Sequence, residues 1–357
     1  MRADIVGRVL IAAIATVLFL KVIVVFYMAQ HGLWSFGKSS DADYYHSYAL
    51  GDAQVLANHW GLILRWCNDV GLYSRQAVTA FLMVIGFLVI PFMIAEIGVG
   101  RKIKRPEAYY VTVLLVSLYP TLFYYSLDIF RDVVLCFSLL VSVYIVGRFF
   151  VVWRMRDRIV LAVGVALLSC FMFLLRPYLG ASFVAAFLGC LFFDFARQRL
   201  GLCAVVYLLA LNGLYMVGGL SQLLLYRSKF ESILEGGSNL GIEFDSVYLF
   251  VPVFLENVVI QLAGLYFSNP IAVCVFFIES IPLLLGGGYV LLNRKFADRM
   301  VSFLVLFFVF YGTVWLIGND NMGTAVRLRL CNYLAVVICV AIVYVNKKNS
   351  VVRVKDS

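Results

Sequence analysis

The sequence predicts an all-α fold, a polytopic bundle of transmembrane helices that takes up the whole chain. Of its 357 residues, 63% are hydrophobic and only 14% are charged, whereas soluble domains average about 45–50% apolar and 25% charged residues. The mean hydropathy is +0.96, and no half of the chain is polar. A soluble enzyme, or a soluble domain held by one membrane anchor, is therefore excluded. We expect a single integral membrane domain over residues 1–357.

Ten apolar runs predict membrane-spanning helices, each of which needs roughly 20 residues. They fall at about 9–29, 77–97, 108–127, 133–153, 159–175, 178–193, 203–225, 270–292, 300–317 and 331–346. The first run follows a basic N-terminus, as a secretory signal does. It has no Ala-x-Ala cleavage site, so we expect it to remain as the first transmembrane helix.

The basic residues predict the orientation of these helices. With the N-terminus in the cytoplasm, every even-numbered connection is rich in Lys and Arg, as is the C-terminal tail. Cytoplasmic loops of membrane proteins have this bias. The net charge of +9 thus indicates topology rather than nucleic-acid binding, and we expect both termini in the cytoplasm.

Two long connections lie on the outer side, residues 30–76 and residues 226–269. Within the second, residues 248–268 are apolar enough to span, but a span would place the basic residues 294–299 outside. We therefore expect a re-entrant or interface-lying helix there. Its polar side would consist of Glu256, Asn257 and Gln261. Because the inner loops are too short for an active site, the function should face outward.

The first outer loop contains the candidate catalytic residues Asp41, Asp43 and His46. A carboxylate or histidine in this setting suits a general base, a metal site or a clamp for sugar hydroxyls. The alternative is that Asp41 caps the following helix and the rest is a solvated loop. A metal site is disfavoured because the motif lacks further ligands, so we expect no metal and no cofactor.

Asp128, Arg131 and Asp132 come after the third run, at spacings that place them on one face of a helical turn. Arg131 either pairs with its own aspartates, or the aspartates orient Arg131 toward an anionic lipid head group. We favour the second, because two carboxylates, an arginine and a cluster of tyrosines are more than a turn needs.

Four further charged residues lie in or beside apolar runs. Arg176 is in a tight turn, and since a charge costs about 2.5–3.5 kcal/mol at mid-span, it needs a partner. That partner is a lipid phosphate reached by snorkelling, or the phosphate of a lipid-linked substrate, which we favour. Arg327 and Arg329 are two residues apart, so they act together only if their segment is unwound. Glu279 should face the bundle interior.

Arginines that converge at the outer ends of helices suit a pyrophosphate, which they bind through paired hydrogen bonds. Apolar walls suit the lipid attached to it. The reaction that fits these groups is glycosyl transfer from a lipid diphosphate, with a carboxylate or histidine orienting or deprotonating the attacking hydroxyl.

The helices, the two long outer loops and the arginines in residues 175–180 and 324–329 resemble Wzy-type O-antigen and polysaccharide polymerases. The resemblance implies a glycosyltransferase of the bacterial inner membrane that joins undecaprenyl-diphosphate-linked oligosaccharide repeats on the periplasmic face. The resemblance also implies that the diphosphate is bound by Arg176, Arg327 and Arg329. Its expected partners are the lipid-linked oligosaccharide, membrane lipids, and assembly proteins such as a flippase and a chain-length regulator.

Two alternatives stay open. Asp41 and Asp43 are also similar to the first-loop carboxylates of the C-type glycosyltransferase superfamily, which implies a single-sugar transferase with a polyprenyl-phosphate donor. The third interpretation is a flippase for lipid-linked glycans, which would need a polar path through the bilayer. Lys21, Arg148 and Glu279 are the obvious charges within the spans. Neutralising Glu279 should abolish transport by a flippase and affect a polymerase less.

Overall fold

The structure is a computed structural model that describes residues 2–31, 41–56, 58–100, 106–231 and 239–355. Over these ranges the chain is helical, without β-strands apart from one isolated bridge between Asn239 and Asn321. The predicted all-α class is therefore confirmed. Residues 32–40, 57 and 232–238, which belong to the two long connections, lie outside the described residues.

Seven of the described helices are long and apolar enough to cross a membrane. They are Ile5–Gln30, Arg75–Val99, Arg131–Val151, Met155–Leu175, Pro270–Leu292, Arg299–Gly318 and Met322–Val351. Each coincides with one of the ten predicted runs, and the chain is a multi-pass membrane protein.

The three other predicted runs form shorter or bent helices. Run 108–127 is divided into α6 (Pro106–Ser117) and α7 (Pro120–Tyr125), because Pro120 disfavours helical backbone at the residue before it. Run 178–193 gives the short helix α10 (Pro177–Gly189). Run 203–225 becomes α11 (Leu200–Met216) and α12 (Ser221–Glu231), bent by 75° after Gly218, whose φ of 75° ends α11.

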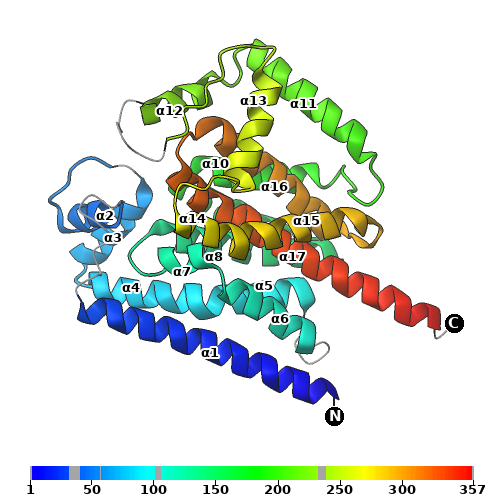
Figure 1. Ribbon diagram of the computed structural model, residues 1–357, viewed down its shortest axis with the longest axis horizontal. Coiled ribbons are helices and arrows are strands. Elements are labelled where there is room, and N and C mark those ends of the chain that lie inside the picture. The colour runs from blue at the N-terminus through cyan, green and yellow to red at the C-terminus, as the bar shows by residue number, and fades with distance from the viewer. Residues whose placement is uncertain (1, 32–40, 57, 101–105, 232–238, 356–357) are drawn as a thin grey trace. The chain divides into compact units, whose positions relative to one another are not determined.

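The first of two compact units comprises Met1–Ala181. Its helices begin with α1 (Arg2–Gln30), which lies along α6 (Figure 1). One span consists of α4 (Arg75–Val84), the π-helical turn η1 (Ile85–Val89) and α5 (Ile90–Val99), and α5 packs against α6 and α8. The hairpin of α8 (Arg131–Val151) and α9 (Met155–Leu175) completes this unit's core.

The described part of the first long connection folds as two helices, α2 (Asp41–Leu50) and α3 (His59–Asp69), which pack on each other. Asn58 caps α3 by accepting from the Trp60 backbone N–H at 3.1 Å. The Trp60 indole donates to the Ile129 carbonyl at 2.8 Å, and α3 also contacts α9. The connection is therefore docked on the residues that precede α8.

The second unit comprises Ser182–Ser357. After α11 and α12 it contains α13 (Phe250–Asn257) with η2 (Val258–Leu262), and one span made of α14 (Pro270–Val275), η3 (Phe276–Ser280) and α15 (Ile281–Leu292). It ends, after the short η4 (Arg294–Phe296), with α16 (Arg299–Gly318) and α17 (Met322–Lys355), and α17 packs on α15 and α16. α15 continues without a break through its three glycines. A Cβ added at Gly286 would lie 3.0 Å from Val340, so this glycine allows α15 to pack closely on α17.

The segment predicted to be re-entrant or interfacial forms an apolar helix over Phe250–Leu262 that is shorter than a span. Asn257 and Gln261 are fully buried, whereas Glu256 is exposed. The prediction that all three form one polar side is therefore wrong, because the two amides point into the unit.

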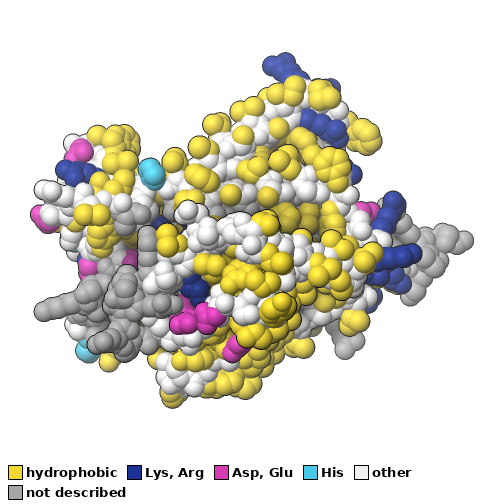
Figure 2. Space-filling model, turned by 90° about the horizontal axis from the view of Figure 1, so that it is seen from above, with side chains coloured by type: hydrophobic (Ala, Val, Ile, Leu, Met, Phe, Trp, Pro, Cys, Tyr) yellow, Lys and Arg dark blue, Asp and Glu magenta, His cyan; other side chains and the backbone are white. Residues whose placement is uncertain are grey.

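The outer faces of many helices are apolar. Phe19 and Phe26 of α1 are 65% and 62% exposed. Hydrophobic side chains are spread widely over the described part of the face drawn in Figure 2, whereas Lys and Arg lie in a few separate groups. Such a surface suits contact with lipid rather than with water.

Candidate functional site

In the first unit, Arg75 joins two predicted site residues. Arg75 is the first residue of α4, which Ser74 caps. Its guanidinium forms a bidentate pair with Asp128, in which Nε donates to Oδ1 at 3.0 Å and Nη2 donates to Oδ2 at 2.6 Å. The remaining nitrogen, Nη1, lies 2.9 Å from Oδ1 of Asp43. Asp128 also accepts from the Ile129 backbone N–H at 2.8 Å. Asp128 is thus held from two sides, while the Asp43 side chain is 30% exposed.

The prediction that Asp128 orients Arg131 is wrong, because Asp128 pairs with Arg75 instead. Residues 127–129 form a bend, and α8 begins only at Arg131. The helical turn that would place Asp128 beside Arg131 therefore does not exist. Asp128 and Asp43 are far apart in the sequence, and only the fold brings both to Arg75.

Arg176 has its partner inside the protein. It is the C-cap of α9, with extended backbone before Pro177. Its Nη2 lies 2.7 Å from Oδ1 of Asp132, and both side chains are only 2% exposed. Asp132 therefore orients Arg176 rather than Arg131, and the carboxylate supplies the compensation that a charge near hydrocarbon requires.

Arg131 is the arginine of this group that forms no ion pair with a carboxylate of the described residues. It is half-buried, and its Nη1 donates to the Leu175 carbonyl at 2.9 Å. Arg131 also begins α8, and helix N-termini have a partial positive charge that favours anions. Of the predicted phosphate-binding residues in the first unit, Arg131 is therefore the one best suited to an external anion.

His46 is held by Tyr73, whose Oη lies 2.8 Å from Nδ1 of His46. Burial raises the pKa of Tyr73 to about 12, so the phenol keeps its proton at neutral pH and can donate it to Nδ1. Asp41, the first residue of α2, is exposed. Of the three predicted catalytic residues, Asp43 is the one that contacts the Arg75 group.

The first unit thus brings Asp43, Asp128, Arg131, Asp132 and Arg176 to the ends of α4, α8 and α9. Arg75, which links these residues, was not predicted as a site residue from the sequence. The sequence does place Arg75 just before an apolar run, and this position could have identified it as a site residue. A cavity of about 500 Å³ adjoins Arg75 and Asp128.

In the second unit, Arg327 and Arg329 lie within α17, a continuous helix from Met322. The unwinding that joint action required is therefore absent, and the two arginines point to nearly opposite sides. Arg329 is 2% exposed, with Nη2 3.7 Å from Oε2 of Glu279. Glu279 is 1% exposed, as its predicted interior position requires, whereas Arg327 is half-buried.

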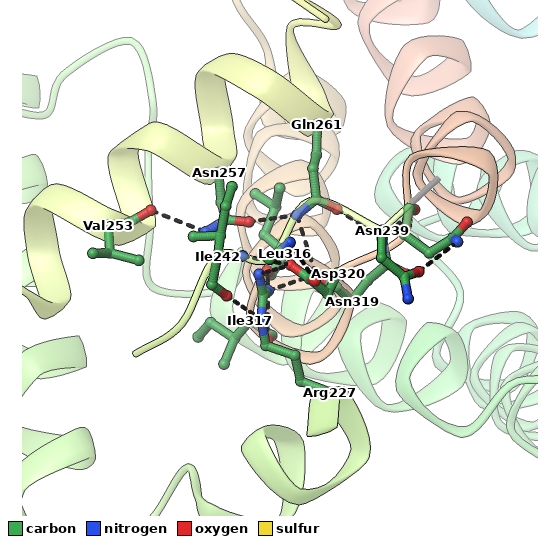
Figure 3. Close-up of polar contacts among 12 residues, drawn as sticks. Arg227, Asn239, Ile242, Val253, Asn257, Gln261, Leu316, Ile317, Asn319 and Asp320 are labelled. Carbon is green, nitrogen blue, oxygen red and sulfur yellow. Dashed lines mark hydrogen bonds and ion pairs between the residues drawn. The ribbon is translucent and has the colours of Figure 1, made fainter. Parts of the chain in front are cut away.

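A second arginine–aspartate group in this unit anchors the turn between α16 and α17 (Figure 3). Buried Arg227 pairs with Asp320, whose carboxylate also accepts from the backbone N–H groups of Gly241 and Ile242 at 2.9 and 3.2 Å. Arg227 donates in addition to the Ile242 carbonyl at 2.8 Å. Asn319 donates to Oε1 of Gln261 at 2.7 Å. Because its charges are satisfied from several sides, we interpret this group as structural.

Lys21 is a buried charge in the span α1 of the first unit. Its Nζ has no hydrogen-bond partner among the described residues and lies 4.8 Å and 5.5 Å from the ring centroids of Phe87 and Phe123. A mid-span lysine costs about 2.5–3.5 kcal/mol, and cation–π contacts return about 2 kcal/mol when desolvated.

We expect Lys21→Met to raise the free energy of unfolding by about 1 kcal/mol, the difference between these two effects. Thermal unfolding in detergent measures this change. Val22→Met, at an exposed neighbouring position, is the matched control and should leave stability unchanged. A loss of stability in Lys21→Met would show that the aromatic contacts outweigh desolvation.

Among the described residues, no group of three or more His, Cys, Asp or Glu side chains is suited to hold a metal ion. Comparison of the chain with models of protein families, with curated proteins and with solved structures found no match. A function is therefore inferred from the residues of the site and their geometry.

Proposed function

We propose that the protein is an integral membrane polymerase that joins undecaprenyl-diphosphate-linked oligosaccharide repeats into a surface polysaccharide, an O-antigen or a capsule. The observation that carries this proposal is the link between Asp43 and the residues that begin α8. A partly exposed carboxylate is connected through Arg75 and Asp128 to a segment whose Arg131 has no carboxylate partner among the described residues. A base and an anion site at the ends of spanning helices are what glycosyl transfer from a lipid diphosphate needs.

In the proposed reaction, a sugar hydroxyl of one repeat attacks the anomeric carbon of another. A new C–O bond forms while the C–O bond to the lipid diphosphate breaks. The hydroxyl proton passes to the Asp43 carboxylate, which Arg75 orients at 2.9 Å. The negative charge that develops on the leaving diphosphate is stabilised by Arg131 and the first turn of α8. Arg176, neutralised by Asp132, holds this segment in place.

The proposal includes about ten spans in the bacterial inner membrane, with both termini cytoplasmic and the connections 30–76 and 226–269 periplasmic. The seven long helices would then be completed by the α6–α7 segment, by α10 and by the bent pair α11–α12. Basic inner connections support this orientation. The lipid-linked oligosaccharide, membrane lipids, a flippase and a chain-length regulator are the proposed partners.

Deleting the gene in its host tests the reaction. We expect loss of the polysaccharide ladder, with single repeats retained on the lipid. A complete ladder of altered composition would contradict the polymerase and support the single-sugar transferase with a polyprenyl-phosphate donor.

The anion site is tested with purified protein and diphosphate-linked repeats. We expect Arg131→Gln to lower turnover by about 10²–10³-fold, the usual effect of removing one donor to developing charge. The fold should persist, because Arg131 is half-buried and makes one hydrogen bond to Leu175. Arg65→Gln, at a half-buried arginine of α3, is the control. Equal turnover of the two variants would remove Arg131 from the site.

A further inference from the structure

The cavity beside Arg75 lies between two spanning helices of the first unit. Its wall on α1 is Val25, and its wall on α4 is formed by residues of one side of the helix. The lining residues are Val25, Arg75, Gln76, Thr79, Ala80, Met83 and Asp128. The volume of about 500 Å³ is within the range of sites for small amphiphilic ligands.

The two ends of this cavity differ in polarity. One end has the Arg75–Asp128 pair, with Asp43 on the other side of the guanidinium. Toward the other end the lining becomes apolar, through Ala80 and Met83 to Val25, and Lys21 lies one helical turn further along α1. An occupant must therefore have a polar head and a hydrocarbon tail.

The cavity is also open at its side. Gln76 and Ala80 line it and are exposed. Because α1 and α4 belong to spanning helices, this side faces the lipid, and a hydrocarbon chain can enter laterally. Burial of apolar chain surface supplies the binding energy.

We propose that this cavity holds the head-proximal part of the polyprenyl chain of the lipid-linked substrate, an inference that rests on the proposed function. Charge favours this occupant over a phospholipid. Asp43 and Asp128 outnumber Arg75 at the polar end, which disfavours an anionic head group placed directly there. A glycolipid brings sugar hydroxyl groups, which these carboxylates can bind.

The test is photolabelling of the full-length protein with a polyprenyl phosphate that has a diazirine in its first isoprene unit. Wild-type protein should be labelled within residues 76–83. Ala80→Trp and the milder Ala80→Phe fill the cavity from its open side and should reduce labelling about tenfold. Val84→Trp is the matched control, since Val84 is exposed on the same helix and does not line the cavity.

The possible outcomes distinguish the cavity assignment from the proposed function. Equal labelling of Ala80→Trp, Ala80→Phe and wild type, or equal competition by a phospholipid, overturns the cavity assignment. If the variants lose labelling while wild-type protein elongates no glycan, the cavity binds the polyprenyl chain and the proposed function is wrong. If they lose labelling and show a raised KM for the full-length lipid donor but not for a short-chain analogue, both are supported.

Discussion

Replacing Arg176 by Ala should lower the free energy of unfolding by about 3–5 kcal/mol, because it leaves the Asp132 carboxylate buried without its guanidinium. Both side chains are 2% exposed and 2.7 Å apart, so water cannot replace the lost partner. Asp132→Ala should have a similar effect. Thermal or denaturant unfolding in detergent measures both changes.

The double variant Arg176→Met/Asp132→Leu removes both charges and should recover most of this stability, since buried pairs are often replaced by apolar residues without loss. This variant also separates two functions of Arg176. If Arg176 holds the diphosphate, as the resemblance to polymerases implies, the double variant is stable and inactive. If Arg176 only supports the start of α8, the double variant keeps turnover. A single Arg176→Ala variant with wild-type stability would contradict the buried pair itself.

The long spans could be predicted from the sequence because an apolar run of sufficient length has few alternatives in a membrane. Two of the runs that do not form one long straight helix are interrupted by a single residue. Pro120 interrupts the run 108–127, and Gly218 ends α11 before the bend. One proline or glycine changes the mean hydropathy of a run very little, but it can end the helix.

The candidate site was predictable in its residue types but not in its pairings. Asp43 was identified as a possible base in the first outer loop, and Asp128 and Arg131 by their spacing next to an apolar run. Their partners depend on tertiary contacts, since Arg75 reaches Asp128 across 53 residues and Arg176 reaches Asp132 across 44. Arg327 and Arg329 lie in the continuous helix α17, which excludes their joint action. Arg329 lies beside the buried Glu279 instead.

Replacing Asp43 by Asn should lower glycan elongation by about 10²–10⁴-fold, the range typical of losing a general base. Asn has the same shape and can still accept a hydrogen bond from Arg75, but it cannot take the proton of the attacking hydroxyl. The Asp43 and Arg75 side chains are 30% and 26% exposed, so stability should fall by only about 0–1 kcal/mol. Initial rates with diphosphate-linked repeats and thermal unfolding of the same sample measure both quantities.

Asp41→Asn is the matched control for this variant. Asp41 and Asp43 both lie in the first turn of α2, where a carboxylate favours the helix through the same dipole effect. The two substitutions therefore change α2 alike, and they differ in that Asp43 contacts Arg75. A large loss of turnover in Asp43→Asn alone identifies a chemical role, because a helix effect would appear in both. Equal losses would assign these carboxylates to the stability of α2, and the base would have to be sought elsewhere.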